Sequence, residues 1–371
     1  MVPFLQDRNF RFSRFIRHLS SALRSILAVS GIATLGFLSS CDLAKLECLD
    51  GDISCNDALL GALFAPQKII AIAGSAGVIW VSRDGGLTYQ QITPGDAGTS
   101  YSHIKVVSAT RILAGGSNGT GPYIIESRSL EANWQAAFNN AGAALLGLVV
   151  TDFGDYAGCG ANGSTQAEVF YNGPDGNWTI TQPAGGLPGS CYIYGGDFYA
   201  TISGGTFNYK REVDGSYSPS GSAAPGPTID GVAINGNIAV LVDNANNRVL
   251  RSTDGANWTP HAITGASACS DAAFGNGVFA VFCVGSDQFM LSTDGINWNP
   301  SSTAPSLALS SVQNISFTDG FFYVMGQDGG GNGTVLQTLD FGSFSTVFSF
   351  PTSTATARDE LIVPASLIPS N

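Results

Sequence analysis

Three aspartates recur in one short motif and are the first residues to consider for chemistry. Asp84, Asp254 and Asp294 each lie two residues after a serine and directly before a glycine. A pair of carboxylates can hydrolyse a glycosidic bond, one as acid and the other as nucleophile or base. The same residues also suit a turn, because a short carboxylate accepts backbone N–H bonds and glycine adopts positive φ. We favour the turn, and we expect these carboxylates to be structural.

An aromatic residue closes each of these motifs. The full pattern resembles the Asp-box of sialidase-like (BNR-type) β-propellers. It comprises Ser82, Asp84, Gly86 and Tyr89, then Ser252, Asp254, Gly255 and Trp258, then Ser292, Asp294, Gly295 and Trp298. The resemblance implies a turn between the third and fourth strands of a blade, with the ring packed between blades. Asp-boxes occur in sialidases and other glycosidases, photosystem II assembly factors and sortilin-like receptors, so the resemblance implies a scaffold rather than an activity.

The closing aromatic recurs along most of the chain. Intervals of 39 to 46 residues separate Tyr89, Trp134, Trp178, Tyr217, Trp258, Trp298 and Phe344. Apolar runs of strand length and Gly-Asn or other polar turns alternate between them, most clearly in residues 230–260 and 270–300. Four strands with their turns occupy about 40–45 residues, the period of a propeller blade. The sequence therefore predicts an all-β fold: a seven-bladed β-propeller of four-stranded antiparallel blades.

The first blade lacks its innermost strand in the sequence. The chain enters this blade at Lys68 with two apolar runs and then reaches the motif at Asp84. A spare strand is available at the C-terminus, in residues 359–367. We expect that strand to complete blade 1 and close the ring, which removes exposed sheet edges. Pro364 is tolerable there because an innermost strand has one unpaired side.

Catalytic signatures are absent from the remaining sequence. A sialidase needs three converging arginines, and the chain after residue 40 has seven arginines with no arrangement of that kind and six glutamates. It contains no nucleophile elbow, P-loop or H-E-x-x-H motif. A metal site is a poor interpretation, because the chain after residue 40 has only two histidines, His103 and His261, and no C-x-x-C pair. We name no catalytic residue, no metal ligand and no cofactor, and a glycoside hydrolase stays open as an alternative.

The N-terminus has the composition of an export signal. Five arginines within the first 24 residues precede an apolar stretch, residues 25–38, too short for a membrane-spanning helix. It ends in Leu38, Ser39, Ser40 and Cys41, which resembles the lipobox of bacterial lipoproteins. The resemblance implies a signal peptide over residues 1–40, lipidation of Cys41, a tether over residues 41–67 and a propeller over residues 68–371. The alternative is an ordinary thiol beyond an uncleaved anchor.

The expected location is the cell envelope, with the protein attached to a membrane through lipid on Cys41. In some Gram-negative bacteria an aspartate after the lipidated cysteine, here Asp42, resembles a signal for retention in the inner membrane, whereas other lineages do not use this signal. We favour the outer membrane or the cell surface. The tether includes one expected short helix, residues 57–65.

Six cysteines remain besides Cys41, an even number that suits an oxidising compartment. Cys269 and Cys283 flank a turn symmetrically, which makes them a possible disulfide. Cys48 and Cys55 close a small loop in the tether, and Cys159 and Cys191 remain, one in blade 3 and one at the start of blade 4; the sequence leaves the connectivity open.

Charge and loop composition indicate the kind of partner. After residue 40 the chain has 11 basic and 27 acidic residues, which argues against nucleic acid. Polar loops in residues 115–122, 160–166, 243–247 and 327–333 are expected on one rim of the channel, unless they are merely solvated connections. The candidate ligand contacts are Asn118, Asp243, Asn244, Asp328 and Asn332. We expect a binding or assembly module for protein or glycan; a passive structural lipoprotein is the other alternative.

Overall fold

The computed structural model describes a large part of the chain from Lys68 onward. The described residues are 68–95, 98–108, 111–140, 142–150, 156–162, 167–172, 178–181, 187–203, 208–212, 214–220, 229–283, 288–301, 309–350 and 357–364. The signal peptide, Cys41, the tether with its expected helix, and Cys48 and Cys55 lie outside them. Within the described residues, no helix has the length and apolar character needed to cross a membrane.

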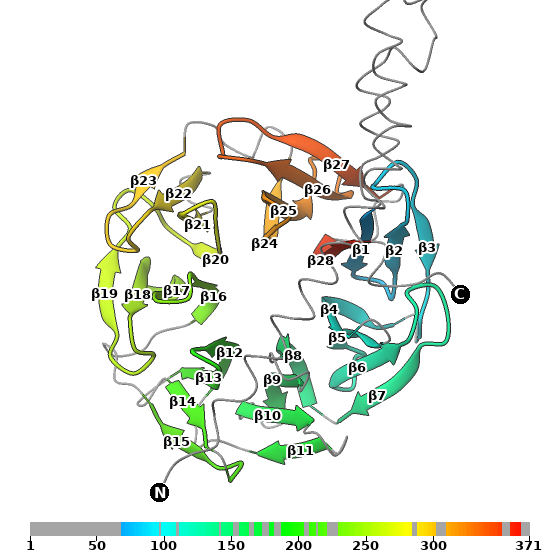
Figure 1. Cartoon of the computed structure of the whole chain (residues 1–371), viewed down its shortest axis with the longest axis horizontal. Coiled ribbons are helices and arrows are strands. Elements are labelled where there is room, and N and C mark those ends of the chain that lie inside the picture. The colour runs from blue at the N-terminus through cyan, green and yellow to red at the C-terminus, as the bar shows by residue number, and fades with distance from the viewer. Residues whose placement is uncertain are drawn as a thin grey trace, which may run out of the picture. The chain divides into compact units, whose positions relative to one another are not determined.

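The described residues form seven four-stranded antiparallel sheets, which we number as blades 1 to 7 in chain order. Figure 1 shows them arranged in a ring around a common axis, as the blades of a β-propeller, and we call the space along this axis the channel. Blade 1 contains β28 (Ala357–Pro364), β1 (Lys68–Gly74), β2 (Ile79–Ser82) and β3 (Gln90–Ile92). Blade 2 contains β4 (Ser100–Ser108), β5 (Arg111–Ser117), β6 (Pro122–Ser127) and β7 (Gln135–Asn139). Blade 3 contains β8 (Gly142–Val150), β9 (Tyr156–Asn162), β10 (Ala167–Asn172) and β11 (Trp178–Thr181).

The other four blades follow the same order from the innermost strand to the outermost. Blade 4 contains β12 (Leu187–Tyr194), β13 (Asp197–Ser203), β14 (Asn208–Arg211) and β15 (Tyr217–Pro219). Blade 5 contains β16 (Ile229–Ile234), β17 (Ala239–Asp243), the 3₁₀ turn η2 (Asn244–Asn246), β18 (Arg248–Ser252) and β19 (Thr259–Ala262). Blade 6 contains β20 (Cys269–Gly275), β21 (Val278–Cys283), β22 (Gln288–Ser292) and β23 (Asn299–Pro300). Blade 7 contains β24 (Ser311–Thr318), β25 (Phe321–Gln327), β26 (Gly333–Thr338) and β27 (Ser345–Ser349).

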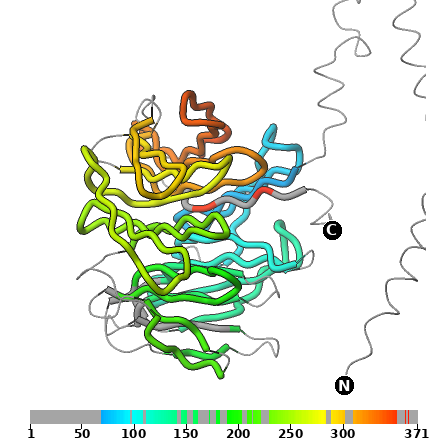
Figure 2. Tube along the Cα trace, turned by 60° about the vertical axis from the view of Figure 1, so that its left-hand side comes forward, coloured from blue at the N-terminus to red at the C-terminus, as the bar shows by residue number. Residues whose placement is uncertain are grey.

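The C-terminal strand β28 lies beside the first strand of the chain. It pairs antiparallel with β1 from Lys68↔Pro364 to Gly74↔Ala357. Figure 2 shows the red segment of β28 beside the blue segment of β1. The expected pairing of this segment with blade 1 is therefore observed. The strand is displaced by two to three residues from residues 359–367 and ends at Pro364, which cannot extend a ladder.

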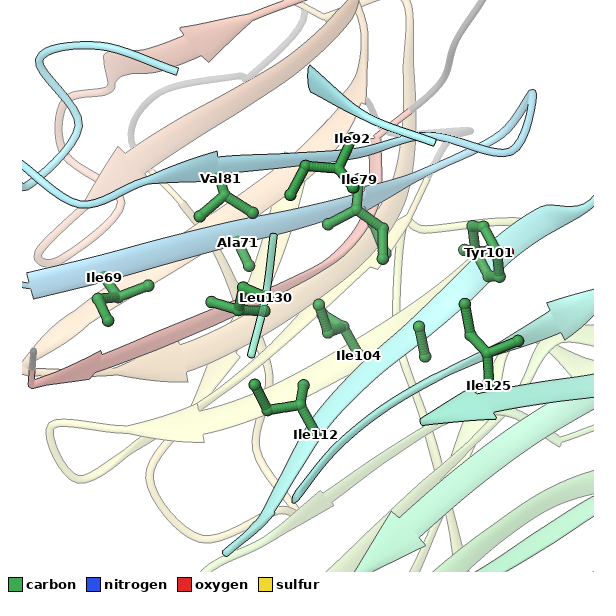
Figure 3. Packing of buried hydrophobic residues seen from close by; sticks show 12 residues of the cluster. Ile69, Ala71, Ile79, Val81, Ile92, Tyr101, Ile104, Ile112, Ile125 and Leu130 are labelled. Atoms are coloured by element: carbon green, nitrogen blue, oxygen red, sulfur yellow. The ribbon is translucent and has the colours of Figure 1, made fainter. Parts of the chain in front are cut away.

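The core contains seven apolar clusters that are each shared by two adjacent blades, and one small cluster within blade 4. Figure 3 shows one of them, in which Ile69 and Ala71 of blade 1 face Ile104 and Ile112 of blade 2. The closing aromatic of one blade packs into each cluster, as the sequence pattern predicts. These rings are Tyr89, Trp134, Trp178, Tyr217, Trp258, Trp298 and Phe344. Trp258 is buried, whereas the other six rings are partly exposed.

The serine–aspartate motifs form the turns before the fourth strands, which we call the Ser–Asp turns. Asp254 Oδ1 accepts the N–H groups of Ala256 and Asn257 at 2.9 and 2.7 Å, and Gly255 N donates to Ser252 Oγ at 2.9 Å. The turn at Asp294 repeats these bonds, and Asp84 accepts from Thr88 N at 2.9 Å. These hydrogen bonds hold the pKa of Asp84, Asp254 and Asp294 well below the usual carboxyl range.

Two disulfides cross-link the described residues. Cys269 is bonded to Cys283, and the two lie opposite each other in the β20–β21 register, as predicted. Cys159 of β9 is bonded to Cys191 of β12, which joins blade 3 to blade 4. The second bond therefore spans one of the apolar clusters between blades.

Candidate functional site

Each innermost strand carries a local irregularity close to its first residues. The pairing of β4, β8, β12, β16, β20, β24 and β28 with the next strand shifts register there. Such a bulge leaves a residue outside the ladder and turns side chains away from the regular alternation. Repeated in seven blades, it places a ring of reoriented residues around one end of the channel.

The two ends of the channel differ in what surrounds them. The turn face carries the Ser–Asp turns, and Lys68 lies there because its carbonyl accepts a hydrogen bond from Gly85 N at 3.2 Å. The loop face is the opposite end, where the innermost strands begin and where the β5–β6, β17–β18 and β25–β26 connections lie. The bulges are on the loop-face side.

A cavity of about 590 Å³ occupies the loop-face half of the channel, and we call it the mouth cavity. Residues of all the innermost strands line it, including the aliphatic Leu146, Leu148, Val149, Ile193 and Val232. The polar lining includes His103, Lys105, Asp230, Asp271, Asn314 and Asp359. A second cavity of about 460 Å³ lies toward the turn face and is lined mainly by apolar residues such as Val106, Val150 and Ile362. The charged groups of the channel thus gather at the loop-face end.

Asp359 is the most deeply placed acid of the cavity wall. Its side chain is 3% exposed and forms an ion pair with Lys105 Nζ at 2.7 Å. The same oxygen, Oδ2, accepts the N–H of Ile104 at 2.9 Å. A buried carboxylate with a charged partner and a backbone donor is well compensated, so this pair has a structural role as well as lining the cavity.

His103 lies next to that pair in the cavity wall. Burial lowers its pKa to about 4, and Lys105 lowers it further while Asp359 opposes the shift. Its side chain is hydrogen-bonded to the backbone of Leu146 in blade 3. The imidazole is therefore neutral at neutral pH, and it adds no positive charge to the cavity.

Two further carboxyl groups lie on the other side of the ring. Burial raises the pKa of Asp271 to about 7, although Ile315 N and Ala272 N donate to its oxygens, both at 2.8 Å. Burial also raises the pKa of Asp230, which accepts a bond from Asn244 Nδ2 at 2.6 Å. Both acids thus occupy positions where a negative charge is poorly solvated, and a cationic ligand would relieve that cost.

The five predicted rim residues lie at the loop face, but none of them lines the mouth cavity. Asn118 and Asp328 accept backbone N–H bonds within their own short connections. Asn332 donates to Asp328, and Asp243 is fully buried in an ion pair with Arg248 at 2.6 Å. Asn244 donates a hydrogen bond to Asp230 of the cavity wall. A ligand contact at these five residues stays a prediction; the structure gives four of them a role in shaping turns.

The connections at the loop face are also shorter than the sequence analysis expected. Strands β5 and β25 continue through Gly116 and Gly326, which leaves residues 118–121 and 328–332 as the connections. A Cβ at either glycine would lie 1.8 Å from a carbonyl oxygen of the neighbouring innermost strand. Gly116 was expected in a loop, whereas both glycines lie in strands and permit a close approach to the neighbouring strand.

No motif in the sequence marks the residues that line the mouth cavity. Asp230, Asp271 and Asn314 stand just before the apolar run of three successive innermost strands. A superposition of the repeats on their glycine-centred turns would have aligned them. Their direction toward the channel depends on the bulges, which no local sequence pattern indicated.

Comparisons with known proteins identify the fold. No family model and no curated protein matches the sequence. Among solved structures, virginiamycin B lyase from Staphylococcus aureus matches with a TM-score of 0.58 and 14% identity, over 71% of this chain and 88% of that one. A protein from Lactobacillus plantarum gives 0.59 and 13%, over 80% and 99% of the two chains. YCF48 bound to D1 peptide gives 0.51 and 14%, over 67% and 81%. At such identities the likeness shows a β-propeller and nothing about function.

Proposed function

We propose that this protein is a lipid-anchored propeller of the cell envelope that binds a segment of a partner protein in the mouth cavity. The observation that carries the proposal is the cavity itself, about 590 Å³ with aliphatic and charged walls at one end of a rigid channel. Concave sites with a mostly apolar wall and a few convergent polar groups are where ligands bind in proteins. We propose binding rather than catalysis because the sequence contains no nucleophile elbow, P-loop or H-E-x-x-H motif.

The anchored state rests on the sequence from Leu38 to Cys41, with support from the fold. Two disulfides fit a compartment outside the reducing cytoplasm. Lys68, the first described residue of the propeller, lies at the turn face, whereas the mouth cavity lies at the loop face. A protein held this way by lipid on Cys41, at the outer membrane or cell surface, keeps the cavity available to a partner.

A protein segment suits the cavity better than a glycan. Leu146, Leu148 and Ile193 offer apolar contacts, whereas Asp230 and Asp271 offer charged ones, and a polypeptide carries both kinds of group. YCF48, a propeller of similar fold, has been solved with a peptide bound. The mature chain is acidic, which continues to disfavour nucleic acid.

Site-specific photocrosslinking in the producing cells tests this proposal. A photoreactive side chain at Leu146, which lines the cavity and is 40% exposed, should give a protein adduct. The matched control is Leu87, 85% exposed in a Ser–Asp turn at the other face. The adduct at position 146 should be lost when Ser190→Trp fills the cavity. Adducts only at position 87, glycan binding without a protein adduct, or no adduct at either position would overturn the proposal.

The anchor has its own test. Cys41→Ala should abolish lipidation and leave an unprocessed precursor, detected by intact mass in the membrane fraction. A wild-type mature protein that carries an unmodified Cys41 would rule out the lipid anchor and leave the binding proposal standing.

A further inference from the structure

Three successive blades present hydrogen-bond acceptors at equivalent positions of the mouth cavity. Asp230 of β16, Asp271 of β20 and Asn314 of β24 each lie at the register shift of their strand. All three line the cavity. We call them the acceptor wall.

The acceptor wall is continuous across the three strands. A Cβ on Gly231 would lie 2.6 Å from the Cα of Asp271, which shows how closely β16 approaches β20. Asp271 Oδ2 in turn accepts the N–H of Ile315, the residue that follows Asn314. A single small group in the cavity can therefore reach more than one of the three side chains.

These acceptors have unused capacity. A carboxylate offers about four lone-pair sites, and the bonds to Asp230 and Asp271 occupy part of them. Asn314 Oδ1 is buried and has no hydrogen-bond partner within the described structure. A buried acceptor without a donor is costly, so a ligand that brings a donor gains from this position.

The wall also lacks a counterion. Neither Asp230 nor Asp271 forms an ion pair among the described residues, whereas the cation of the cavity, Lys105, is paired with Asp359. His103 is neutral, as shown above. The missing element is a positively charged group with several N–H donors.

We propose that Asp230, Asp271 and Asn314 recognise one protonated amine or guanidinium, carried by a lysine or arginine side chain of the bound protein segment. This inference rests on the proposed function and specifies its ligand. An ammonium brings three donors and a guanidinium five, which suits a wall of two carboxylates and an amide oxygen.

The titration of Asp271 supplies a second signature. A nearby cation favours the ionised carboxylate, so binding releases a proton where the unliganded pKa is about 7. Asp359 and Lys105 act on this group in opposite directions, and Asp230 shares its wall. Affinity for the cation should therefore rise between pH 6 and pH 8.

Calorimetry on the lipidated protein in detergent tests the inference. The probes are acetylated, amidated pentapeptides Gly-Ser-X-Ser-Gly in which X is lysine, arginine, glutamine or norleucine. The lysine or the arginine peptide should bind roughly tenfold more tightly than the two neutral peptides, and the better of the two identifies the cation. Asp271→Asn, Asp230→Asn and Asn314→Leu should each reduce that preference by a similar factor. Asp340→Asn, an exposed acid in the β26–β27 turn, should leave it unchanged.

Thermal unfolding of each variant is the control for an intact propeller. Asp271→Asn should also remove the pH dependence of binding. Equal affinity for all four peptides, or an unchanged preference in Asp230→Asn and Asp271→Asn, would overturn the inference. With a crosslink at position 146 still present, that result would leave the binding function in place. Binding of none of the peptides together with no crosslink would overturn both.

Discussion

The carboxylate of Asp359 accepts a 2.9 Å hydrogen bond from the backbone N–H of Ile104, 255 residues earlier in the chain. Asp359 belongs to β28 in blade 1, and Ile104 belongs to β4 in blade 2. The same oxygen pairs with Lys105 at 2.7 Å. The C-terminal strand thus completes its own blade and also bonds to the next one inside the channel.

Truncation after Thr356 should destabilise the propeller severely. It removes β28, leaves β1 with an unpaired edge and strips Ile104 N of its acceptor. We expect aggregation, or a large fall in the denaturant midpoint. The control is truncation after Pro364, which keeps β28 whole. Equal midpoints for the two truncated proteins would mean that the strand contributes little.

Trp258→Ala should cost about 3–5 kcal/mol, because it empties a buried position between blades 4 and 5. Trp298→Ala should cost less, since Trp298 is only half-buried. Asp254→Ala should cost about 1–2 kcal/mol through lost turn bonds. Chemical denaturation measures all three. Loss of ligand binding in Asp254→Ala with unchanged stability would refute the structural role of the Ser–Asp turns.

Asp271→Asn should change the pH dependence of stability. The raised pKa of Asp271, about 7, means that this residue favours the folded state at acidic pH and loses that contribution as pH rises through 7. The melting temperature of the variant relative to wild type should therefore increase from pH 4 to pH 8, by at least about 2 °C. Asp294→Asn should show the opposite sense, with its cost present at neutral pH and fading at strongly acidic pH, because the pKa of Asp294 is lowered. Parallel melting curves for wild type and Asp271→Asn would contradict the assignment.

Replacing Cys159 and Cys191 together by serine should lower stability by about 3–4 kcal/mol, the entropic value for a closed loop of some 30 residues. Cys269 and Cys283 close a smaller loop within one hairpin, with 14 residues of separation, so their double replacement should cost less. Denaturant midpoints with and without reductant measure both. An unchanged midpoint in the first variant would show that the blade 3 to blade 4 link is not stabilising.

Local sequence patterns determined the repeating unit of this protein. Apolar runs of strand length, glycine-centred turns and the spacing of the closing aromatics act within one hairpin, so they can be interpreted without a structure. The fourth strands begin at or directly after Tyr89, Trp134 and Trp258, and Cys269 lies opposite Cys283, as those patterns predict. The sequence also predicted that the C-terminal strand joins blade 1, because blade 1 lacks its innermost strand and an unpaired strand leaves exposed backbone hydrogen-bonding groups.

The channel was decided by tertiary structure alone. Asp243 and Asp328 are polar loop residues in the sequence, yet one is buried beside Arg248 and the other bonds its own turn. Asp230, Asp271 and Asn314 look like ordinary polar residues at the beginning of strands, and only the bulges of three separate blades bring them to one wall. The physical reason is range: hydrogen bonds within a turn depend on four or five neighbouring residues, whereas a cavity depends on how seven sheets meet around an axis.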